Sequence, residues 1–171
     1  MNSATHTFLA VKDPDTGKLL HFGYGSEYND TKGAFGGKLS LRHYSDDINI
    51  MRGLNSDRVK AKILIEPPVN ENGVQMSDKE FSQKVINIAN SFGNNPNIGY
   101  FLLPQNETQG NCNTSSSTIL HKAGVLNEKI REIRDKIPGF VTGFGDYKPW
   151  TIQEQNKAVE RQKLENYKLS F

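Results

Sequence analysis

The chain has 171 residues, with 21 Lys and Arg against 19 Asp and Glu and a formal net charge of +2. This balance gives no strong positive field, so we expect no nucleic-acid partner. No apolar run approaches the roughly 18 residues that a membrane span needs, and we expect no signal peptide at the first residues. The single cysteine excludes an internal disulfide and any metal site built from several cysteines, so we expect no metal and no cofactor.

The first part of the chain predicts an antiparallel hairpin. Residues 6–11 are rich in β-formers, residues 13–17 form a turn sequence, and residues 18–24 predict the second strand. Partial alternation over residues 38–44 predicts a third strand. The β-rich run at residues 60–65, which is followed by two prolines, predicts a fourth.

The rest of the chain predicts mainly helices. The clearest one begins with a capping box formed by Ser77 and Glu80 and carries apolar residues on one face as far as Phe92. The other predicted helices span residues 112–123, 126–137 and 151–167. We therefore expect an α+β domain over residues 1–150 and a polar C-terminal helix or extension over residues 151–171.

The single cysteine, Cys112, stands between a polar loop and a predicted helix of small and polar residues. A sulfur at a helix N-terminus lies near unpaired amides and the positive end of the helix dipole, which favour thiolate over thiol. The same amides can stabilise an oxyanion after attack on a carbonyl. A buried structural thiol fits the same local sequence, so a non-catalytic binding module with a core cysteine stays open.

A cysteine nucleophile needs a base, and the chain offers four histidines. His121 lies nine positions after Cys112 on the predicted helix, about 13 Å away at 1.5 Å per residue, which is too far. His43 lies in an uncertain strand, where a surface position is expected. His6 and His21 lie on two strands joined by one turn, so one can act as base while the other fixes its tautomer.

Three stretches of the sequence resemble the NlpC-type cell-wall peptidases. The stretches His6 to Val11 and Gly17 to His21 resemble that family's two strands, each with a histidine. The stretch from Tyr100 to Thr114 resembles its Tyr … Gly-x-Asp-Cys-Ser-Gly nucleophile element, with Asn111 and Asn113 in place of Asp and Ser. The resemblance implies that Cys112 is the nucleophile, His6 the base and His21 its orienting partner. It also implies a group that binds the substrate or the oxyanion, in which we place Tyr100, Asn111 and Asn113.

The order of these elements is the reverse of the common order in that family, because the histidine hairpin precedes the cysteine. This order resembles the circularly permuted branch, which includes lecithin retinol acyltransferase-like enzymes with an Asn-Cys-Glu-His nucleophile stretch, and Asn111-Cys112 is similar to it. The resemblance implies a papain-like α+β fold in which an antiparallel sheet packs against the nucleophile helix and further helices.

The resemblance also implies a function and partners. The expected substrate is the peptide part of peptidoglycan, cleaved at an amide bond by an amidase or endopeptidase. Without a signal peptide, such an enzyme would act in a target cell's periplasm as an antibacterial effector delivered by a specialised secretion system, with an immunity protein as partner. Without such delivery it would be cytoplasmic. The enzymatic alternative is an acyltransferase, or a lipid or protein amide hydrolase, of the permuted branch.

Overall fold

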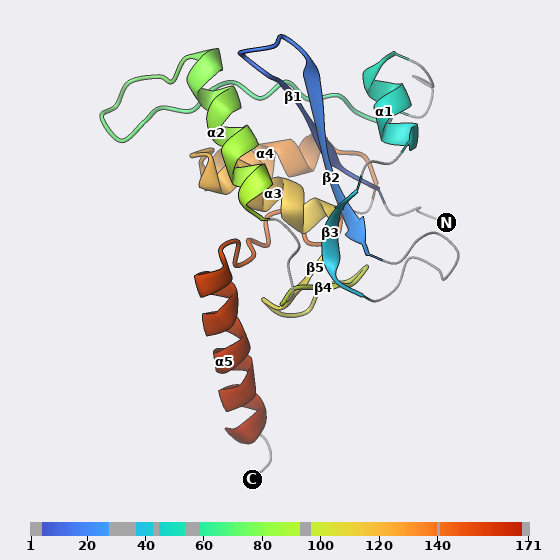
Figure 1. Ribbon diagram of the computed structural model, residues 1–171, viewed down its shortest axis with the longest axis vertical. Helices are drawn as coiled ribbons and strands as arrows, with labels where there is room; N and C mark the ends of the chain where they lie inside the picture. The colour runs from blue at the N-terminus through green and yellow to red at the C-terminus, as the bar shows by residue number, and fades with distance from the viewer. Residues whose placement is uncertain are drawn as a thin grey trace.

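A computed structural model describes residues 5–27, 37–42, 45–53, 59–92, 97–139 and 141–168. In these ranges the chain forms a three-stranded antiparallel sheet, a short parallel strand pair and the helices α1 to α5 (Figure 1). The α+β class expected from the sequence is confirmed. None of the helices in the described ranges has the length and apolar character needed to cross a membrane.

The antiparallel sheet has the order β1-β2-β3. Its strands are β1 (Phe8–Lys12), β2 (Leu19–Ser26) and β3 (Leu39–Arg42). The β1–β2 turn closes with a hydrogen bond from the amide of Gly17 to the carbonyl of Asp13, and Gly17 has a φ of 70°, which favours glycine. The predicted hairpin and third strand are confirmed.

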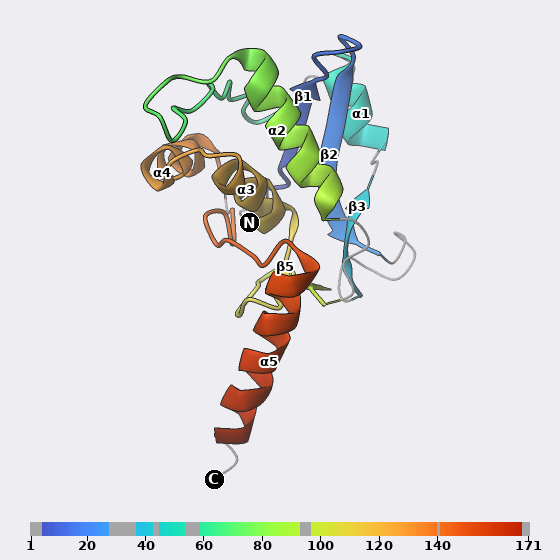
Figure 2. The same ribbon diagram turned by 60° about the vertical axis from the view of Figure 1, so that its left-hand side comes forward.

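Helices cover both faces of this sheet. Helix α2 (Asp78–Ser91) begins with the predicted capping box of Ser77 and Glu80. The hydroxyl of Tyr24, on β2, donates to the carbonyl of Ala89, on α2, at 2.9 Å. Figures 1 and 2 show α2 and the short helix α1 (Ser45–Met51) on opposite sides of the sheet. Because side chains alternate along a strand, β2 presents Tyr24 to α2, and His21 and Gly23 to the other face.

Helix α3 (Cys112–Lys122) is the central helix of the fold. Every residue from Cys112 to Leu120 is buried, and α3 contacts β1, β2, α2 and the next helix, α4 (Asn127–Lys136). Small side chains allow these neighbours to approach α3 on all sides. Gly124, at a φ of 104°, ends α3. Figure 1 shows that α3 and α4 then run in opposite directions.

The remaining elements complete the body and extend from it. Strands β4 (Gly99–Tyr100) and β5 (Gln109–Gly110) pair in parallel just before α3. Trp150 is buried in the core, and its ring Nε1 donates to the carbonyl of Ile88. Helix α5 (Ile152–Lys168) starts there and projects away from the rest of the protein (Figures 1 and 2). The predicted helices at 112–123, 126–137 and 151–167 are therefore confirmed.

The strand predicted at residues 60–65 is wrong. Within the described residues this segment pairs with no strand, and its Leu64 side chain is 89% exposed. Ile63 and Ile65 do pack against the core, as alternation requires, but no neighbouring strand completes a ladder. The surface position predicted for His43 lies outside the described residues.

Candidate active site

The start of α3 is fixed by its N-cap residue, Asn111. The side-chain oxygen of Asn111 accepts hydrogen bonds from the amides of Asn113 at 2.9 Å and Thr114 at 3.0 Å. The Thr114 hydroxyl in turn accepts from the amide of Asn111, which forms a reciprocal capping box. The helix therefore begins at Cys112, as predicted, and Cys112 takes the first helical position.

This cap decides which amides remain for an oxyanion. Asn113 and Thr114 give their N–H groups to the cap, whereas the N–H of Cys112 is not one of the donors that Asn111 uses. The side-chain amide nitrogen of Asn111 donates to the carbonyls of Leu102 and Thr142. The side chain of Asn111 is thus occupied in holding the helix start, and a contact with substrate would require one of these bonds to break.

The His6 ring contacts both Cys112 and Asp47. His6 Nε2 lies 2.9 Å from Asp47 Oδ2, and the ring also makes a side-chain hydrogen bond with Cys112. Since Nε2 faces the carboxylate, Nδ1 is the nitrogen left for the sulfur. The His6 side chain is 38% exposed and Cys112 is 8% exposed, so the site lies at the rim of the core. The structure thus brings together the cysteine and the histidine that the sequence paired.

Asp47, on α1, is the residue that sequence reasoning missed. His21 Nε2 lies 3.0 Å from the same Asp47 Oδ2 that His6 contacts, so one carboxylate oxygen accepts from two imidazoles. We expected His21 to orient the His6 ring. In the structure Asp47 contacts His6 Nε2, and His21, on β2, contacts the same oxygen of Asp47. In sequence, Asp46 and Asp47 show only the acidic residues typical of a helix start, which is no signal for a site.

The charges of this cluster reinforce one another. Burial lowers the pKa of the His6 imidazole, but hydrogen bonds to Asp47 and Cys112 outweigh it and raise the pKa to about 10. Burial raises the pKa of the Asp47 carboxyl, but hydrogen bonds from His21 and His6 outweigh it and lower the pKa to about 2. At neutral pH the pair is therefore an imidazolium and a carboxylate.

Gly23 allows the two histidines and the aspartate to assemble. It lies two positions after His21 on the same face of β2. A Cβ atom at Gly23 would lie 2.7 Å from Cε1 and 2.8 Å from Nε2 of His21, and 3.2 Å from Oδ2 of Asp47. The absence of a side chain at this position therefore makes room for the hydrogen bond between His21 and Asp47.

The segment that carries His6 is anchored on both sides. The Thr5 hydroxyl donates to the carbonyl of Pro138 at 2.8 Å. On the other side, the Thr7 hydroxyl donates to Asn113 Oδ1 at 2.9 Å. Asn113 is 4% exposed, and its side-chain nitrogen Nδ2 donates to the carbonyl of Thr142. Asn113, which we predicted to bind substrate, thus connects the segment before β1 with α3.

Two other residues from the sequence analysis occupy different surroundings. Tyr100, on β4, is 8% exposed and belongs to the hydrophobic core, and its place in substrate binding stays a prediction. His121 is exposed at the end of α3 and stacks on the ring of Tyr147 at 3.9 Å between centroids. This exposed position agrees with the spacing from Cys112 that excluded His121 as the base.

A nucleophilic sulfur, an imidazolium and a carboxylate in series are the groups that acyl transfer by a cysteine requires. In the described parts of the chain, no three His, Cys, Asp or Glu side chains are placed to hold a metal ion. Comparison of the chain with protein-family models, with curated proteins and with solved structures found no match.

Proposed function

We propose that the chain is a cysteine hydrolase that cleaves amide bonds, with Cys112 as nucleophile and His6 as base and acid. The observation that carries this proposal is the position of the His6 ring, which contacts the Cys112 side chain and lies 2.9 Å from the carboxylate of Asp47. A base that contacts both a nucleophile and an orienting group is the arrangement that activates a cysteine. In this proposal Asp47 orients His6, and His21 positions Asp47.

The architecture that we propose is papain-like, in the circularly permuted order of the NlpC-type branch. Two features support it. The nucleophile lies at the first position of a buried helix, and that helix packs on an antiparallel sheet. The base lies two residues before the first strand of the same sheet, β1.

In the first step, the sulfur of Cys112 attacks the carbonyl carbon of the scissile amide. A C–S bond forms and the carbonyl oxygen becomes an oxyanion. The N–H of Cys112, which the Asn111 side chain does not use, is the backbone donor that we assign to it. The proton given up by the thiol is held on His6. As the C–N bond breaks, His6 returns that proton to the leaving amine, and a thioester remains on Cys112.

In the second step, water hydrolyses this thioester. Neutral His6 takes a proton from the water while its oxygen attacks the acyl carbon. The C–S bond breaks, the carboxylic acid leaves, and Cys112 and His6 return to the thiolate and imidazolium. Asp47 holds the His6 ring throughout, because its carboxylate stays ionised with a pKa lowered, against the effect of burial, to about 2.

For the substrate, we propose the peptide part of peptidoglycan, on the basis of the resemblance of the two histidine strands and the cysteine element to cell-wall peptidases. The biological setting that fits is an antibacterial effector that acts in a target-cell periplasm, with an immunity protein that covers Cys112. Expression of the chain with a periplasmic signal should then be toxic to bacteria, whereas cytoplasmic expression should not.

The direct test is incubation of the purified chain with peptidoglycan fragments and, separately, with phospholipid, followed by mass spectrometry of the products. We expect cleaved peptides from wild type and none from Cys112→Ala or His6→Ala. Thr16→Val is the control, because the Thr16 hydroxyl only donates to Asp13 in the exposed β1–β2 turn, and it should retain full activity. Acyl transfer from phospholipid without peptide cleavage would assign the acyltransferase activity instead.

A non-catalytic binding module is favoured by one observation, the 8% exposure of Cys112. Thiol reactivity separates it from the hydrolase. We expect iodoacetamide to alkylate Cys112 in the folded protein at neutral pH, and His6→Ala to slow the reaction by about tenfold or more, since the imidazolium partner of the thiolate is lost. Alkylation only after unfolding would favour the binding module.

A further inference from the structure

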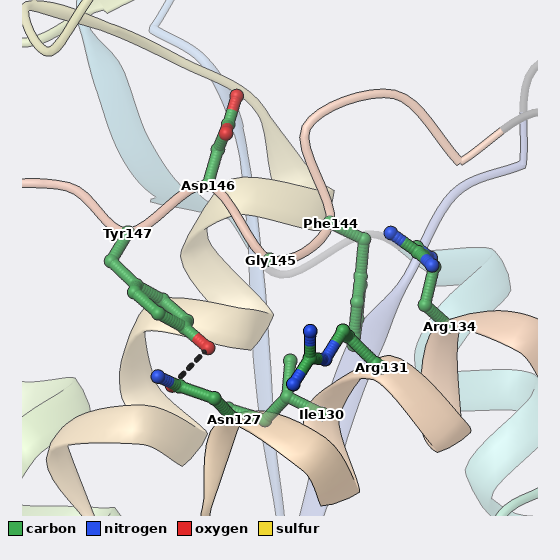
Figure 3. A pocket seen from close by; sticks show the side chains of 8 residues that line it. All are labelled: Asn127, Ile130, Arg131, Arg134, Phe144, Gly145, Asp146 and Tyr147. Atoms are coloured by element: carbon green, nitrogen blue, oxygen red, sulfur yellow. Dashed lines mark hydrogen bonds between the residues drawn. The ribbon is translucent and has the colours of Figure 1, made fainter.

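A surface pocket of about 320 Å³ lies between α4 and the loop of residues 144–147 (Figure 3). Neither Cys112 nor His6 lines this pocket, so it is separate from the reacting groups. Its floor is apolar, because Ile130 and Phe144 are only 1% and 6% exposed. The volume is at the lower end of the range for ligand pockets and fits one side chain or one terminal group of a peptide.

The wall of this pocket is positively charged. Arg131 and Arg134 lie three positions apart on α4 and therefore share a face. Arg134 binds its neighbour Asp135 at 3.1 Å, whereas Arg131 forms no ion pair with any residue that the structure describes. Figure 3 shows the Arg131 guanidinium pointing into the pocket and the carboxylate of Asp146 pointing away from it.

Three further residues shape the opening of the pocket. The Tyr147 hydroxyl donates to Asn127 Oδ1 at 2.8 Å, which leaves the side-chain N–H groups of Asn127 as donors. Gly145 has a φ of 96°, and a Cβ atom there would meet nothing within 4 Å, so this side of the pocket is open. The pocket thus combines donors, a free guanidinium and an apolar floor, which suits a carboxylate carried on an apolar group.

Two segments connect the pocket with the candidate active site. The loop that lines it begins next to Thr142, whose carbonyl accepts from Asn113, the residue after Cys112. At the end of α4, the carbonyl of Pro138 accepts from Thr5, the residue before His6. Helices α3 and α4 run in opposite directions (Figure 1), so the last turn of α4, which carries Arg134, lies at the same end of this helical pair as the start of α3, where Cys112 lies.

We propose that this pocket is a substrate subsite, in which Arg131 binds a free carboxylate of the peptide that is cleaved at Cys112. The inference rests on the proposed hydrolase function and adds the substrate feature that the enzyme selects. Guanidinium and carboxylate match as two parallel hydrogen bonds, so Arg131 discriminates between a peptide acid and the corresponding carboxamide.

The test compares a tetrapeptide of the peptidoglycan stem that ends in a free carboxylate with the same peptide ending in a carboxamide. In wild type we expect the carboxamide to lower kcat/KM by about tenfold, mainly through KM, as for the loss of a hydrogen bond to a charged group. In Arg131→Met the two peptides should be cleaved equally. Lys129→Met is the matched control, because Lys129 lies on the same helix, pairs with Glu132 and does not line the pocket.

A binding measurement separates failure of the subsite from failure of the hydrolase. The same two peptides are titrated into Cys112→Ala protein with and without Arg131→Met, and the backbone amide signals of Phe144 and Gly145 are followed by NMR. Tighter binding of the acid, lost in Arg131→Met, supports the subsite even if wild type cleaves neither peptide. Equal binding of acid and carboxamide by the Cys112→Ala protein would overturn the subsite, whatever wild type cleaves.

Discussion

The hydroxyl of Thr7 lies 2.9 Å from Oδ1 of Asn113, which ties the residue after His6 to the residue after Cys112. The same hydroxyl lies 3.2 Å from the hydroxyl of Ser116, one turn further along α3. The base of the proposed enzyme lies outside the strands of the sheet, so its position depends on such contacts. This link connects the segment that carries His6 with the start of α3, where Cys112 lies.

Replacing Thr7 by valine removes the hydroxyl and keeps the shape of the side chain. We expect a loss of about 1 to 2 kcal/mol in the free energy of unfolding, because Asn113 Oδ1 loses its strongest donor inside the core. We also expect slower alkylation of Cys112 by iodoacetamide, since the His6 ring is held less firmly. Urea unfolding and the alkylation rate of the folded protein measure the two effects.

Thr16→Val is the control for this change. The hydroxyl of Thr16 donates to Asp13 in the exposed β1–β2 turn, far from α3, so its loss should leave the alkylation rate of Cys112 unchanged. An alkylation rate in Thr7→Val equal to that of wild type would show that His6 is positioned without Thr7.

Asp47→Asn tests the role of the shared carboxylate. The change keeps the size of the side chain but removes the negative charge that lies 2.9 Å from His6 Nε2. We expect the pKa of His6 to fall from about 10 toward its ordinary value of 6.5, measured by NMR titration of the ring protons. Hydrolytic activity should fall by roughly 100-fold or more, because the base is no longer oriented.

Asp15→Asn is a matched control for charge. Asp15 lies in the β1–β2 turn and faces Lys79 at 3.6 Å in an exposed pair, so its neutralisation should leave both the His6 titration and the activity unaltered. If Asp47→Asn left the His6 titration as in wild type, Cys112 alone would account for the raised pKa and Asp47 would lose its assigned role.

Stability should depend on pH through His6. Its pKa is raised from 6.5 in the unfolded chain to about 10 in the folded protein, by hydrogen bonds to Asp47 and Cys112 that outweigh burial. The folded state therefore holds more protons between these values, and the stabilisation is full below pH 6.5 and is lost as pH rises through about 10. We expect the free energy of unfolding of wild type to fall across this window more steeply than that of His6→Gln. Parallel curves would contradict the assignment.

At acidic pH, stability should depend on the protonation of Asp47, and this contribution should decrease as pH falls. Hydrogen bonds from His21 and His6 outweigh burial and lower the pKa of the carboxyl from 3.8 to about 2. The unfolded chain therefore binds the extra proton between these values, so the stabilisation is present above pH 3.8 and is lost as pH falls toward 2. Acid unfolding of Asp47→Asn should lack this component.

The contact between Cys112 and His6 could be predicted because each residue has a local signal. Cys112 follows a polar loop and precedes a run of small residues that predicts a helix, and His6 lies at the start of a predicted hairpin. Both positions can therefore be recognised from the local sequence. The contacts of Asp47 with His6 and His21 could not be predicted, because they depend on the packing of α1 against β2. No local sequence pattern encodes this packing. For Asn111 a signal did exist, since asparagine directly before a helix favours the N-cap role that it takes.

The strand predicted at residues 60–65 shows a similar limit. The alternation of side chains along an extended segment predicts which of them face the core, and Ile63 and Ile65 do face it. It does not state whether another strand lies alongside, because a ladder depends on neighbours that are distant in sequence. The short helix α1 has too few residues to show a clear helical period of apolar residues in the sequence. It nevertheless carries Asp47, on which the proposed site depends.

Gly23→Ala should disturb the site without removing any of its groups. The new methyl group would lie 2.7 Å from Cε1 of His21 and 3.2 Å from Oδ2 of Asp47, closer to the ring than carbon atoms can approach. We expect a loss of about 1 to 3 kcal/mol in the free energy of unfolding, as in other overpacked sites. Activity should fall as well, because His21 and Asp47 must move apart and His6 loses its orientation.

The double variant Gly23→Ala with His21→Ala decides whether the clash with the ring is the cause. Removing the ring frees the space that the methyl group needs, so the two changes together should cost less than the sum of each alone. A strongly non-additive cycle in the free energy of unfolding would locate the strain between these two residues. Additive costs would instead place the effect of Gly23→Ala in the backbone of β2, and the absence of a side chain at this position would then have no part in forming the site.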